Sequence, residues 1–256
     1  MLYEEERKLK IVEYIQEHSR ASVQELGRLF DVSESTIRRD LKELEEAKLL
    51  KRTHGGAVCP EGVTFEPTFG EKEDRFRKEK ESIAKKAAEL IQDGDTILMD
   101  SGTTTFYLAQ EIKKFTKLTI ITNSLILAQE LQGLKGIEVV ITGGTLRQNT
   151  LALVGPIAEN SLGMVRVDKA FIATNGIDLK DGLTTPNLIE AATKRKMIEV
   201  AKQVVLLADH TKFGKVAFAQ FSGLPKVDIC ITDDRVPQDV IRVMENRGIN
   251  VHVVKP

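Results

Sequence analysis

The sequence predicts a mixed α/β protein with two domains, and three observations support this prediction. The first 58 residues have the apolar spacing of three helices followed by a β-hairpin. From about residue 96 onward, short β-rich runs alternate with helical segments, which is typical of an α/β domain with a mostly parallel sheet. Prolines and glycines interrupt the chain between residues 59 and 70. We therefore expect an N-terminal domain over 1–58, a linker with a charged helix over 59–79, and a second domain over 80–256.

The first two helices are predicted from apolar spacing and from a cap. Apolar residues from Leu9 to Ile15 recur at helical intervals and predict an amphipathic first helix. Ser22 and Glu25 have the Ser-x-x-Glu pattern of a capping box, in which each side chain bonds the backbone N–H of the other residue. A short second helix is therefore expected behind them, with an apolar stripe that includes Leu29.

A third helix and a hairpin complete the N-terminal domain. Ser33 suits the N-cap position of a helix that runs to about Lys48. The segment Leu49–Val58 is then expected to form two short strands around a turn at Gly55 and Gly56. Helix, helix, tight turn, helix and hairpin follow one another in the order of a winged helix-turn-helix, which is a DNA-binding fold.

The third helix has a polar face that suits DNA contact. Apolar residues between Ile37 and Leu44 mark the side that faces the core, which places Arg39 and Lys42 on the opposite face. Arg39 is the first candidate for base readout, because arginine can donate two hydrogen bonds to guanine O6 and N7. An ordinary solvated face is the alternative, which the turn, cap and hairpin together disfavour. The predicted DNA-contacting residues are Ser35, Thr36, Arg38, Arg39 and Lys42 on the helix, and Lys51, Arg52, Thr53, His54 and Gly55 on the hairpin.

The total charge lacks the basic excess that is usual for proteins that bind nucleic acids. The chain has 37 Lys+Arg against 38 Asp+Glu, a net charge of -1. Residues 1–58 contain 11 basic and 12 acidic side chains. Attraction to DNA must therefore come from a small basic patch rather than from bulk charge. We expect Glu43, Glu45 and Glu46 to lie toward the far end of the third helix, away from that patch.

The second domain is expected to contain a mostly parallel sheet. Several of its strands are apolar without alternation, as strands buried on both faces are. The predicted strands are Thr96–Met99, Leu118–Thr122, Glu138–Thr142, Lys169–Ala173, Val204–Ala208, Asp228–Thr232 and Asn250–Val254. The predicted helices are Glu71–Ile91, Phe106–Lys113, Leu125–Leu131, Pro156–Leu162, Leu188–Ala201 and Gln238–Arg247.

Polar or glycine-rich loops follow several of these strands, so they would meet at one edge of a parallel sheet. The segment Asp100–Thr105 follows a strand and opens a helix, and its N–H groups and hydroxyls suit a phosphate. An ordinary helix cap is the alternative for that segment, and an ordinary surface lysine is the alternative for Lys212. The predicted effector-binding residues are Asp100, Ser101, Gly102, Thr103, Thr104, Asn123, Gly143, Gly144, Asn175, Gly176, Asp178 and Lys212.

Both domains resemble a known family. The stretches Val32–Leu44 and Arg52–Ala57 resemble the N-terminal signature of the DeoR-type bacterial transcriptional regulators. The stretches Asp100–Thr104 and Ala208–Gly214 resemble the C-terminal sensor of the same family. The resemblance implies a repressor of a sugar or polyol catabolic operon, which a phosphorylated sugar or polyol releases from its double-stranded operator DNA. It also implies that the chain forms a homo-oligomer, either a dimer or a tetramer.

The sensor of that family is similar to ribose-5-phosphate isomerase, which raises an enzymatic alternative. The isomerase has an adjacent Asp-Glu pair where this chain has only Asp178, and its catalytic glutamate falls near Lys194. Because proton transfer needs a positioned carboxylate base, we expect no enzymatic activity and no catalytic residues. Glu190 and Lys194, at positions i and i+4, are interpreted as a surface ion pair that is structural or adjacent to the ligand. An isomerase with a DNA-binding appendage and a sensor that only oligomerises remain as alternatives.

The sequence predicts no metal site, disulfide framework or membrane span. The chain has 2 cysteines and 4 histidines, without the spacing of metal ligands. Cys59 is expected in the linker, and Cys230 is expected in the core. No apolar run approaches the roughly 18–20 residues that cross a bilayer, and the N-terminus lacks the pattern of a signal peptide. We therefore expect a cytoplasmic protein without a cofactor.

Overall fold

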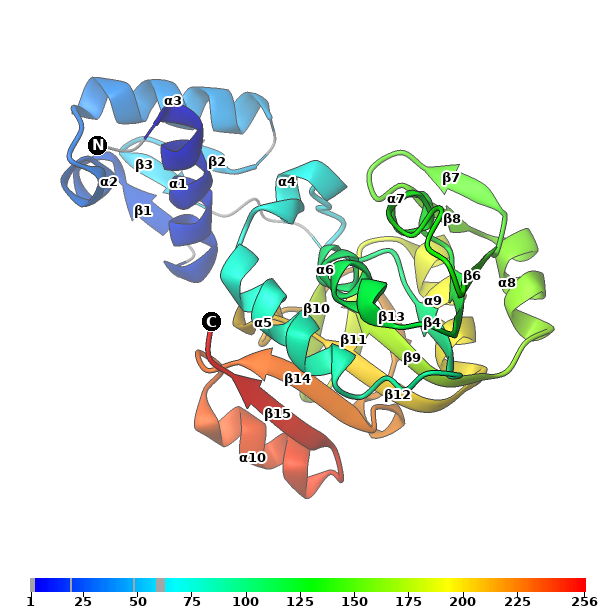
Figure 1. Ribbon diagram of the computed structural model, residues 1–256. Helices are drawn as coiled ribbons and strands as arrows, with labels where there is room; N and C mark the ends of the chain where they lie inside the picture. Colours follow the sequence, from blue (N-terminus) through cyan, green and yellow to red (C-terminus); the bar gives the residue numbers. More distant parts are fainter. Residues whose placement is uncertain (1–2, 19, 48, 59–62) are drawn as a thin grey trace. The chain divides into compact units, whose positions relative to one another are not determined.

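The computed structural model describes residues 3–18, 20–47, 49–58 and 63–256. The chain divides into two compact units, Met1–Phe76 and Arg77–Pro256, which are described separately below (Figure 1). The predictions for Lys48 and Cys59 lie outside the described residues.

The first unit contains a helical core closed by a small antiparallel sheet. Its elements are α1 (Glu4–His18), β1 (Arg20–Ser22), α2 (Val23–Phe30), α3 (Glu34–Glu46), β2 (Lys51–Thr53), β3 (Gly56–Val58) and α4 (Phe69–Glu73). The strand order is β1-β3-β2, so β3 is the central strand. Buried apolar residues of α1, α2 and α3 pack together, among them Ile15, Leu26 and Ile37. This is the predicted winged helix-turn-helix with a third strand added.

Both predicted helix caps of this unit are confirmed. The Ser22 Oγ accepts a hydrogen bond from the Glu25 backbone N–H at 3.1 Å, and a Glu25 carboxylate oxygen accepts one from the Ser22 N–H at 3.2 Å. Ser33 caps α3, because its Oγ accepts a hydrogen bond from the Thr36 N–H at 3.2 Å. These bonds satisfy N–H groups that a helix leaves without an internal partner.

Three details of this unit differ from the sequence prediction. The strand β1 was not expected, because three residues are too few to produce an alternating pattern. Gly56 begins β3 and does not form part of the turn; a Cβ there would lie 2.0 Å from the Ala21 carbonyl oxygen, so only glycine fits. Leu29 is 52% exposed and does not belong to the core stripe of α2.

The predicted charged helix over Glu71–Ile91 is wrong, because two separate helices occupy this region. The helix α4 starts at Phe69, where Thr68 and Glu71 form a second capping box. The helix α5 spans Arg77–Ala88. Between the two helices, Phe76 has a φ of 50°, in the left-handed region, which an α-helix cannot continue through.

The second unit contains a parallel sheet with strand order β15-β14-β12-β9-β4-β5-β6. Its strands are β4 (Thr96–Met99), β5 (Leu118–Thr122), β6 (Ile137–Ile141), β9 (Val167–Ala173), β12 (Ala201–Leu207), β14 (Ile229–Asp233) and β15 (Asn250–Val254). Its α-helices after α5 are α6 (Thr103–Glu111), α7 (Leu125–Glu130), α8 (Pro156–Gly163), α9 (Leu188–Glu199) and α10 (Gln238–Asn246). The helices α5 and α6 cover one face of the sheet and α9 covers the other (Figure 1). All seven predicted strands are confirmed to within a few residues.

Two smaller sheets lie outside the main sheet, and the sequence did not predict them. The hairpin β7 (Thr145–Arg147) and β8 (Ala152–Val154) follows β6. The strands β10 (Gly176–Asp178), β11 (Gly182–Thr185) and β13 (Ala219–Ser222) form an antiparallel sheet. Strands of three or four residues rarely carry a recognisable alternation, so local sequence did not reveal them. As predicted, Cys230 is in the core, where burial raises the pKa of its thiol to about 12.

The order of the main sheet defines a switch point. The chain proceeds outward from β4 through β5 to β6, and it then returns to place β9 on the other side of β4. In parallel α/β sheets, ligands bind at the carboxyl ends of the strands where the order reverses in this way. The loops after β4 and β9 therefore frame the candidate site of the second unit.

Candidate functional site

The exposed face of α3 carries the predicted basic residues. Ile37 and Leu41 are buried, whereas the side chain of Arg39 is 68% exposed. Arg38 and Lys42 are exposed to a similar degree. The structure therefore presents these three basic side chains to solvent on one helix, as the apolar spacing predicted.

A buried ion pair that the sequence analysis missed fastens α3 to α1. Arg7 donates from Nε and Nη2 to the two carboxylate oxygens of Asp40, at 2.6 and 3.0 Å. Both side chains are buried, and the hydrogen bond to Asp40 raises the pKa of Arg7. The signal was present in the sequence, since Asp40 falls on the apolar side of α3 beside Ile37 and Leu41. A charge on a buried helix face requires a buried partner.

The exposed basic residues have acidic partners close by, so the expectation that the acids lie apart from the basic patch is wrong. The ion pairs are Arg38–Glu34 at 2.9 Å, Arg39–Glu43 at 3.2 Å, Lys42–Glu46 at 3.9 Å and Arg52–Glu45 at 3.1 Å. Three of these pairs join residues at i and i+4 on α3, which are neighbours on a helix surface. The exposed surface of α3 and the hairpin therefore carries positively and negatively charged side chains next to one another.

The hairpin presents its predicted residues to solvent. All residues of β2 are exposed, and so are His54 and Gly55 in the turn. The Arg52 N–H donates to a Glu45 carboxylate oxygen at 2.8 Å, which ties the hairpin to α3. The predicted basic residues of the helix and of the hairpin therefore belong to two elements that are connected directly.

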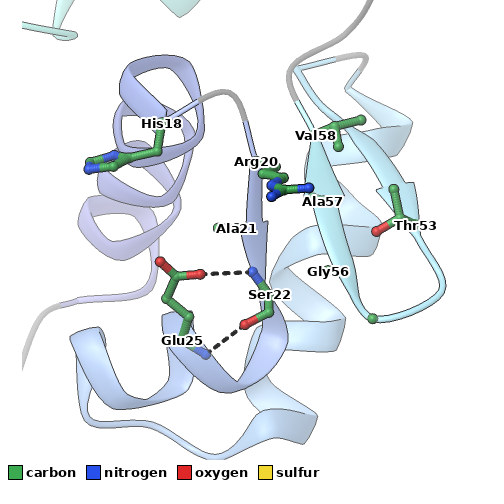
Figure 2. Close-up of a pocket in the computed structure, with 10 residues that line it drawn as sticks. His18, Arg20, Ala21, Ser22, Glu25, Thr53, Gly56, Ala57 and Val58 are labelled. Carbon is green, nitrogen blue, oxygen red and sulfur yellow. Dashed lines mark hydrogen bonds between the residues drawn. The ribbon is translucent and has the colours of Figure 1, made fainter.

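A cavity of about 620 Å³ lies between the end of α1 and the strands β1 and β3 (Figure 2). Two of the predicted DNA-contacting residues, Thr53 and Gly55, are among the residues that line this cavity. Ser22 and Glu25, the residues of the capping box shown in Figure 2, line the cavity, and Glu25 also accepts a hydrogen bond from the Tyr14 hydroxyl at 2.6 Å. The hydrogen bonds from Tyr14 and from the Ser22 backbone lower the pKa of Glu25. The bond from Tyr14 joins α1 to α2 through Glu25, so this lining residue has a structural role.

At the switch point of the second unit, a buried ion pair joins β4, β9 and α9. The Lys194 ammonium bonds the carboxylate of Asp100 and also donates to the Ala173 carbonyl oxygen at 3.0 Å. Asp100 accepts a further hydrogen bond from the Ala173 N–H at 3.1 Å. Burial raises the pKa of Asp100, and the charge of Lys194 opposes that rise. The carboxylate of Asp100 is therefore engaged within the protein.

A second buried pair lies next to the first. The Arg147 guanidinium on β7 bonds the Glu190 carboxylate on α9, and the Thr185 hydroxyl donates to Glu190 at 3.1 Å. Glu190 and Lys194 are 4.0 Å apart and both are buried, so the expected surface ion pair is wrong. The expectation failed because this face of α9 packs toward the sheet, which local spacing does not reveal.

The predicted phosphate segment forms the beginning of α6. The helix starts at Thr103, three residues earlier than predicted, with Gly102 as its N-cap. A Cβ on Gly102 would lie 2.5 Å from the Cβ of Ala173, so this position requires glycine for the loop to pack on β9. The side chains of Ser101 and Thr104 are mostly buried beside it. The N–H groups of the first helical turn have no acceptor within the helix, which suits an anion.

Three more of the predicted segments end neighbouring strands at the same edge. Asn123 follows β5, and its amide donates to the Leu153 carbonyl oxygen at 3.0 Å. Its Oδ1 is buried and has no hydrogen-bond partner among the residues that the structure describes. Gly143 and Gly144 follow β6 with φ values of 68° and 118°. Asn175 follows β9 and accepts a hydrogen bond from Thr185 at 3.2 Å, while Gly176 begins β10.

Asp178 and Lys212 both make contacts within the second unit. Asp178 accepts hydrogen bonds from the backbone N–H groups of Asp181 and Lys180 in the turn after β10, and these bonds lower its pKa. The Lys212 ammonium lies 3.6 Å from a carboxylate oxygen of the buried Asp209. Burial alone would raise the pKa of Asp209, but the charges of Lys212, Lys80 and His210 and a hydrogen bond from Thr211 together outweigh burial, and the pKa is lowered.

Two classes of feature are absent from the part of the chain that the structure describes. Its His, Cys, Asp and Glu residues form no group of three or more that could hold a metal ion. Its helices include none that is long and apolar enough to cross a lipid bilayer.

Two sequence profiles match the two units. The profile described as "DeoR-like helix-turn-helix domain" matches residues 7–63, and the profile described as "DeoR C terminal sensor domain" matches residues 75–234. Together they span α1 to α3, the hairpin and most of the parallel sheet.

Several curated proteins named as transcriptional regulators or repressors are similar over almost the whole chain. The chain is 42% identical over 246 residues to the HTH-type transcriptional regulator GlpR of Haloferax volcanii, covering 96% of both proteins. It is 35% identical to the HTH-type transcriptional repressor GlcR of Bacillus subtilis, covering 99% of this chain and 98% of that protein. It is 34% identical to the glycerol-3-phosphate regulon repressor of Escherichia coli, covering 95% and 96%.

Among solved structures, ribose-5-phosphate isomerase A of Methanocaldococcus jannaschii is similar over part of the chain. The TM-score is 0.38 at 19% identity, and the similarity covers 52% of this chain and 53% of the isomerase.

Proposed function

Because this chain belongs to the DeoR family of transcriptional regulators, we propose that it represses a sugar or polyol operon and is released from DNA by a phosphorylated effector. The observation that carries the proposal is the row of exposed basic side chains on α3, in a unit that matches a helix-turn-helix profile. The names of two relatives, the repressor GlcR and the glycerol-3-phosphate regulon repressor, support repression and a carbohydrate-related regulon.

The family consists of regulators and not of enzymes. The buried carboxylates of the second unit are consistent with the absence of a catalytic base. The relatives of this chain are named transcriptional regulators or repressors. At the switch point, both buried carboxylates, Asp100 and Glu190, are paired with a cation. A carboxylate held in this way is a poor general base, because proton transfer requires a free carboxylate within reach of the substrate.

For DNA, we assign base readout to Arg39 and backbone contacts to its neighbours. Arg39 is an exposed arginine on the face of α3 opposite its buried apolar residues, where a guanidinium can enter the major groove. Lys51 and Arg52 on β2 would contact phosphates, which position the protein without reading sequence. A two-fold symmetric dimer would place two α3 helices in successive major grooves, roughly 34–36 Å apart.

Replacing Arg39 with alanine should remove most of the discrimination between operator and random DNA. A bidentate arginine–guanine contact is worth about 1–3 kcal/mol, or roughly 5- to 150-fold in affinity. The measurement is a fluorescence-anisotropy titration with the duplex that the wild-type protein selects from a randomised library, and with a scrambled duplex of the same composition. The control is Lys51→Ala, which should weaken binding to both duplexes alike and reduce the salt slope by about 1. Wild-type selectivity in the Arg39→Ala protein would exclude Arg39 as the base reader.

For the effector, we assign the phosphate to the start of α6. The N–H groups of its first turn and the hydroxyls of Ser101, Thr103 and Thr104 would bind phosphate oxygens. The buried Oδ1 of Asn123 would accept a hydrogen bond from a sugar hydroxyl. The two buried ion pairs nearby leave no net charge, so backbone donors would balance most of the phosphate charge.

Replacing Thr103 with glutamate should block the effector and leave repression permanently on. The new carboxylate would occupy the phosphate position and repel the ligand. The measurement is release of the protein from its selected duplex by each member of a panel of phosphorylated sugars and polyols. Thr103→Val serves as the matched variant, because it keeps the shape and removes only the hydroxyl, so it should respond at a higher effector concentration. A normal response of Thr103→Glu would place the phosphate elsewhere.

A further inference from the structure

The guanidinium of Arg39 is held by acidic side chains from two helices. Its Nε donates to the Glu43 carboxylate on α3 at 3.2 Å, and its Nη2 lies 3.4 Å from the Glu4 carboxylate on α1. The two contacts use the side edge of the guanidinium, formed by Nε and Nη2. An arginine side chain has five N–H donors, so Nη1 and the second hydrogen of Nη2 remain for an external partner.

Lys8 forms ion pairs with both Glu43 and Glu4. Its ammonium lies 2.5 Å from Glu43 and 2.8 Å from Glu4, and its side chain is only 12% exposed. Lys8 is therefore an anchored cation that holds the two carboxylates in place. Hydrogen bonds from Lys8 lower the pKa of both Glu4 and Glu43, so both acids are ionised at neutral pH.

We infer that Glu43 and Glu4 are positioning residues for base readout, which hold Arg39 so that the end of its guanidinium points toward a guanine. This inference rests on the proposed role of Arg39. The two donors at the free end, on Nη1 and Nη2, match the two acceptors of guanine, O6 and N7. Holding a flexible side chain in its bound conformation before association reduces the entropy lost on binding. The acids therefore favour the specific complex.

The same two acids oppose non-specific binding. Random DNA offers Arg39 mainly phosphates, and a carboxylate beside the guanidinium repels them. The first turn of α1 contains three acids, which stabilise the helix start through the macrodipole. Only Glu4 among them contacts Arg39, whereas Glu5 contacts Lys8 at 3.3 Å and is 88% exposed. Glu4 is therefore the acid of this turn that can position Arg39, whereas Glu5 serves only the helix start and Lys8.

The test is Glu43→Ala, compared with Glu46→Ala as the matched control. Both substitutions remove one negative charge from α3, but Glu46 contacts Lys42 at 3.9 Å and not Arg39. Electrostatics alone predicts that both variants bind all DNA more tightly. Loss of positioning predicts instead that Glu43→Ala binds the selected duplex about two- to tenfold more weakly, while its affinity for the scrambled duplex rises. Glu46→Ala should bind both duplexes slightly more tightly.

Two further variants sharpen the test. Glu43→Gln has the same change in charge as Glu43→Ala but keeps an oxygen that can accept from the Arg39 Nε, so it should recover part of the lost selectivity. On α1, Glu4→Ala should lose selectivity and Glu5→Ala should not. If Glu43→Ala and Glu46→Ala change both affinities alike, the positioning role is wrong.

The outcome also separates this inference from the proposed role of Arg39. If Arg39→Ala loses selectivity and Glu43→Ala keeps it, Arg39 reads the base without help and only the positioning role fails. If Arg39→Ala keeps selectivity, the proposed base reader itself is wrong. In an Arg39→Ala background, Glu43→Ala should have no larger effect than Glu46→Ala, because the side chain to be positioned is gone.

Discussion

Replacing Lys194 with methionine is expected to lower the free energy of unfolding of the second unit by about 3–5 kcal/mol. The ammonium of Lys194 is the cation that bonds Asp100, which is fully buried at the end of β4. Methionine keeps the length of the side chain but leaves the Asp100 carboxylate without a counterion. A buried charge without a partner is far more costly than the net stabilisation that the pair provides.

The measurement is hydrogen exchange of the full-length protein, followed by mass spectrometry in peptides that contain β4 and β9. These peptides should exchange much faster in Lys194→Met. The control is Lys202→Met, which removes a cation from an exposed pair with Asp168, where the side chains are 74% and 37% exposed; exchange in these peptides should stay near the wild-type rate. The double variant Asp100→Asn with Lys194→Met should regain most of the stability. Equal exchange in Lys194→Met and Lys202→Met would refute a structural role for the buried pair.

Replacing Arg7 with methionine should have an effect of similar size in the first unit. Asp40 would then be buried on the core side of α3 without its bidentate partner, at an expected cost of about 3–5 kcal/mol. Because this pair connects α1 to α3, peptides from both helices should lose protection against exchange. DNA binding should weaken for selected and scrambled duplexes alike, since the whole helix loses its support.

An exposed ion pair on the same helix provides the control for Arg7. Arg38→Met removes the partner of Glu34, and both side chains are largely exposed, so protection of α1 and α3 should stay near the wild-type level. Arg7→Met combined with Asp40→Leu should restore protection, because an apolar residue suits the buried face of α3. If the single Arg7 variant keeps wild-type protection, the pair does not stabilise the unit.

Local patterns were sufficient to predict the strands of the main sheet and most of the helices, the long helix over Glu71–Ile91 being the exception. The capping box of Ser22 and Glu25 and the cap at Ser33 depend on residues within three positions of each other, so they can be recognised in the sequence. Strands such as β4 and β5 were predicted with their observed ends, because buried parallel strands are short apolar runs. Local spacing also predicted which residues of α3 are exposed.

The same local patterns failed where a partner lies far along the chain. The strand β1 forms only because β3 pairs with it, and three residues do not predict a strand alone. The acids on α3 were expected to lie apart from the basic residues, but i,i+4 geometry brings them together. The contact of Glu4 with Arg39 joins residues 35 positions apart and required the packing of α1 on α3.

The sequence by itself determined the two-domain organisation, the family, and the face of α3 that meets solvent, because these depend on periodicity, caps and short motifs. Only the tertiary structure decided how charge is arranged. Lys194 and Asp100 are 94 positions apart, and Arg7 and Asp40 are 33 positions apart. Burial makes such charges dependent on a partner, and only the packing of distant elements selects that partner.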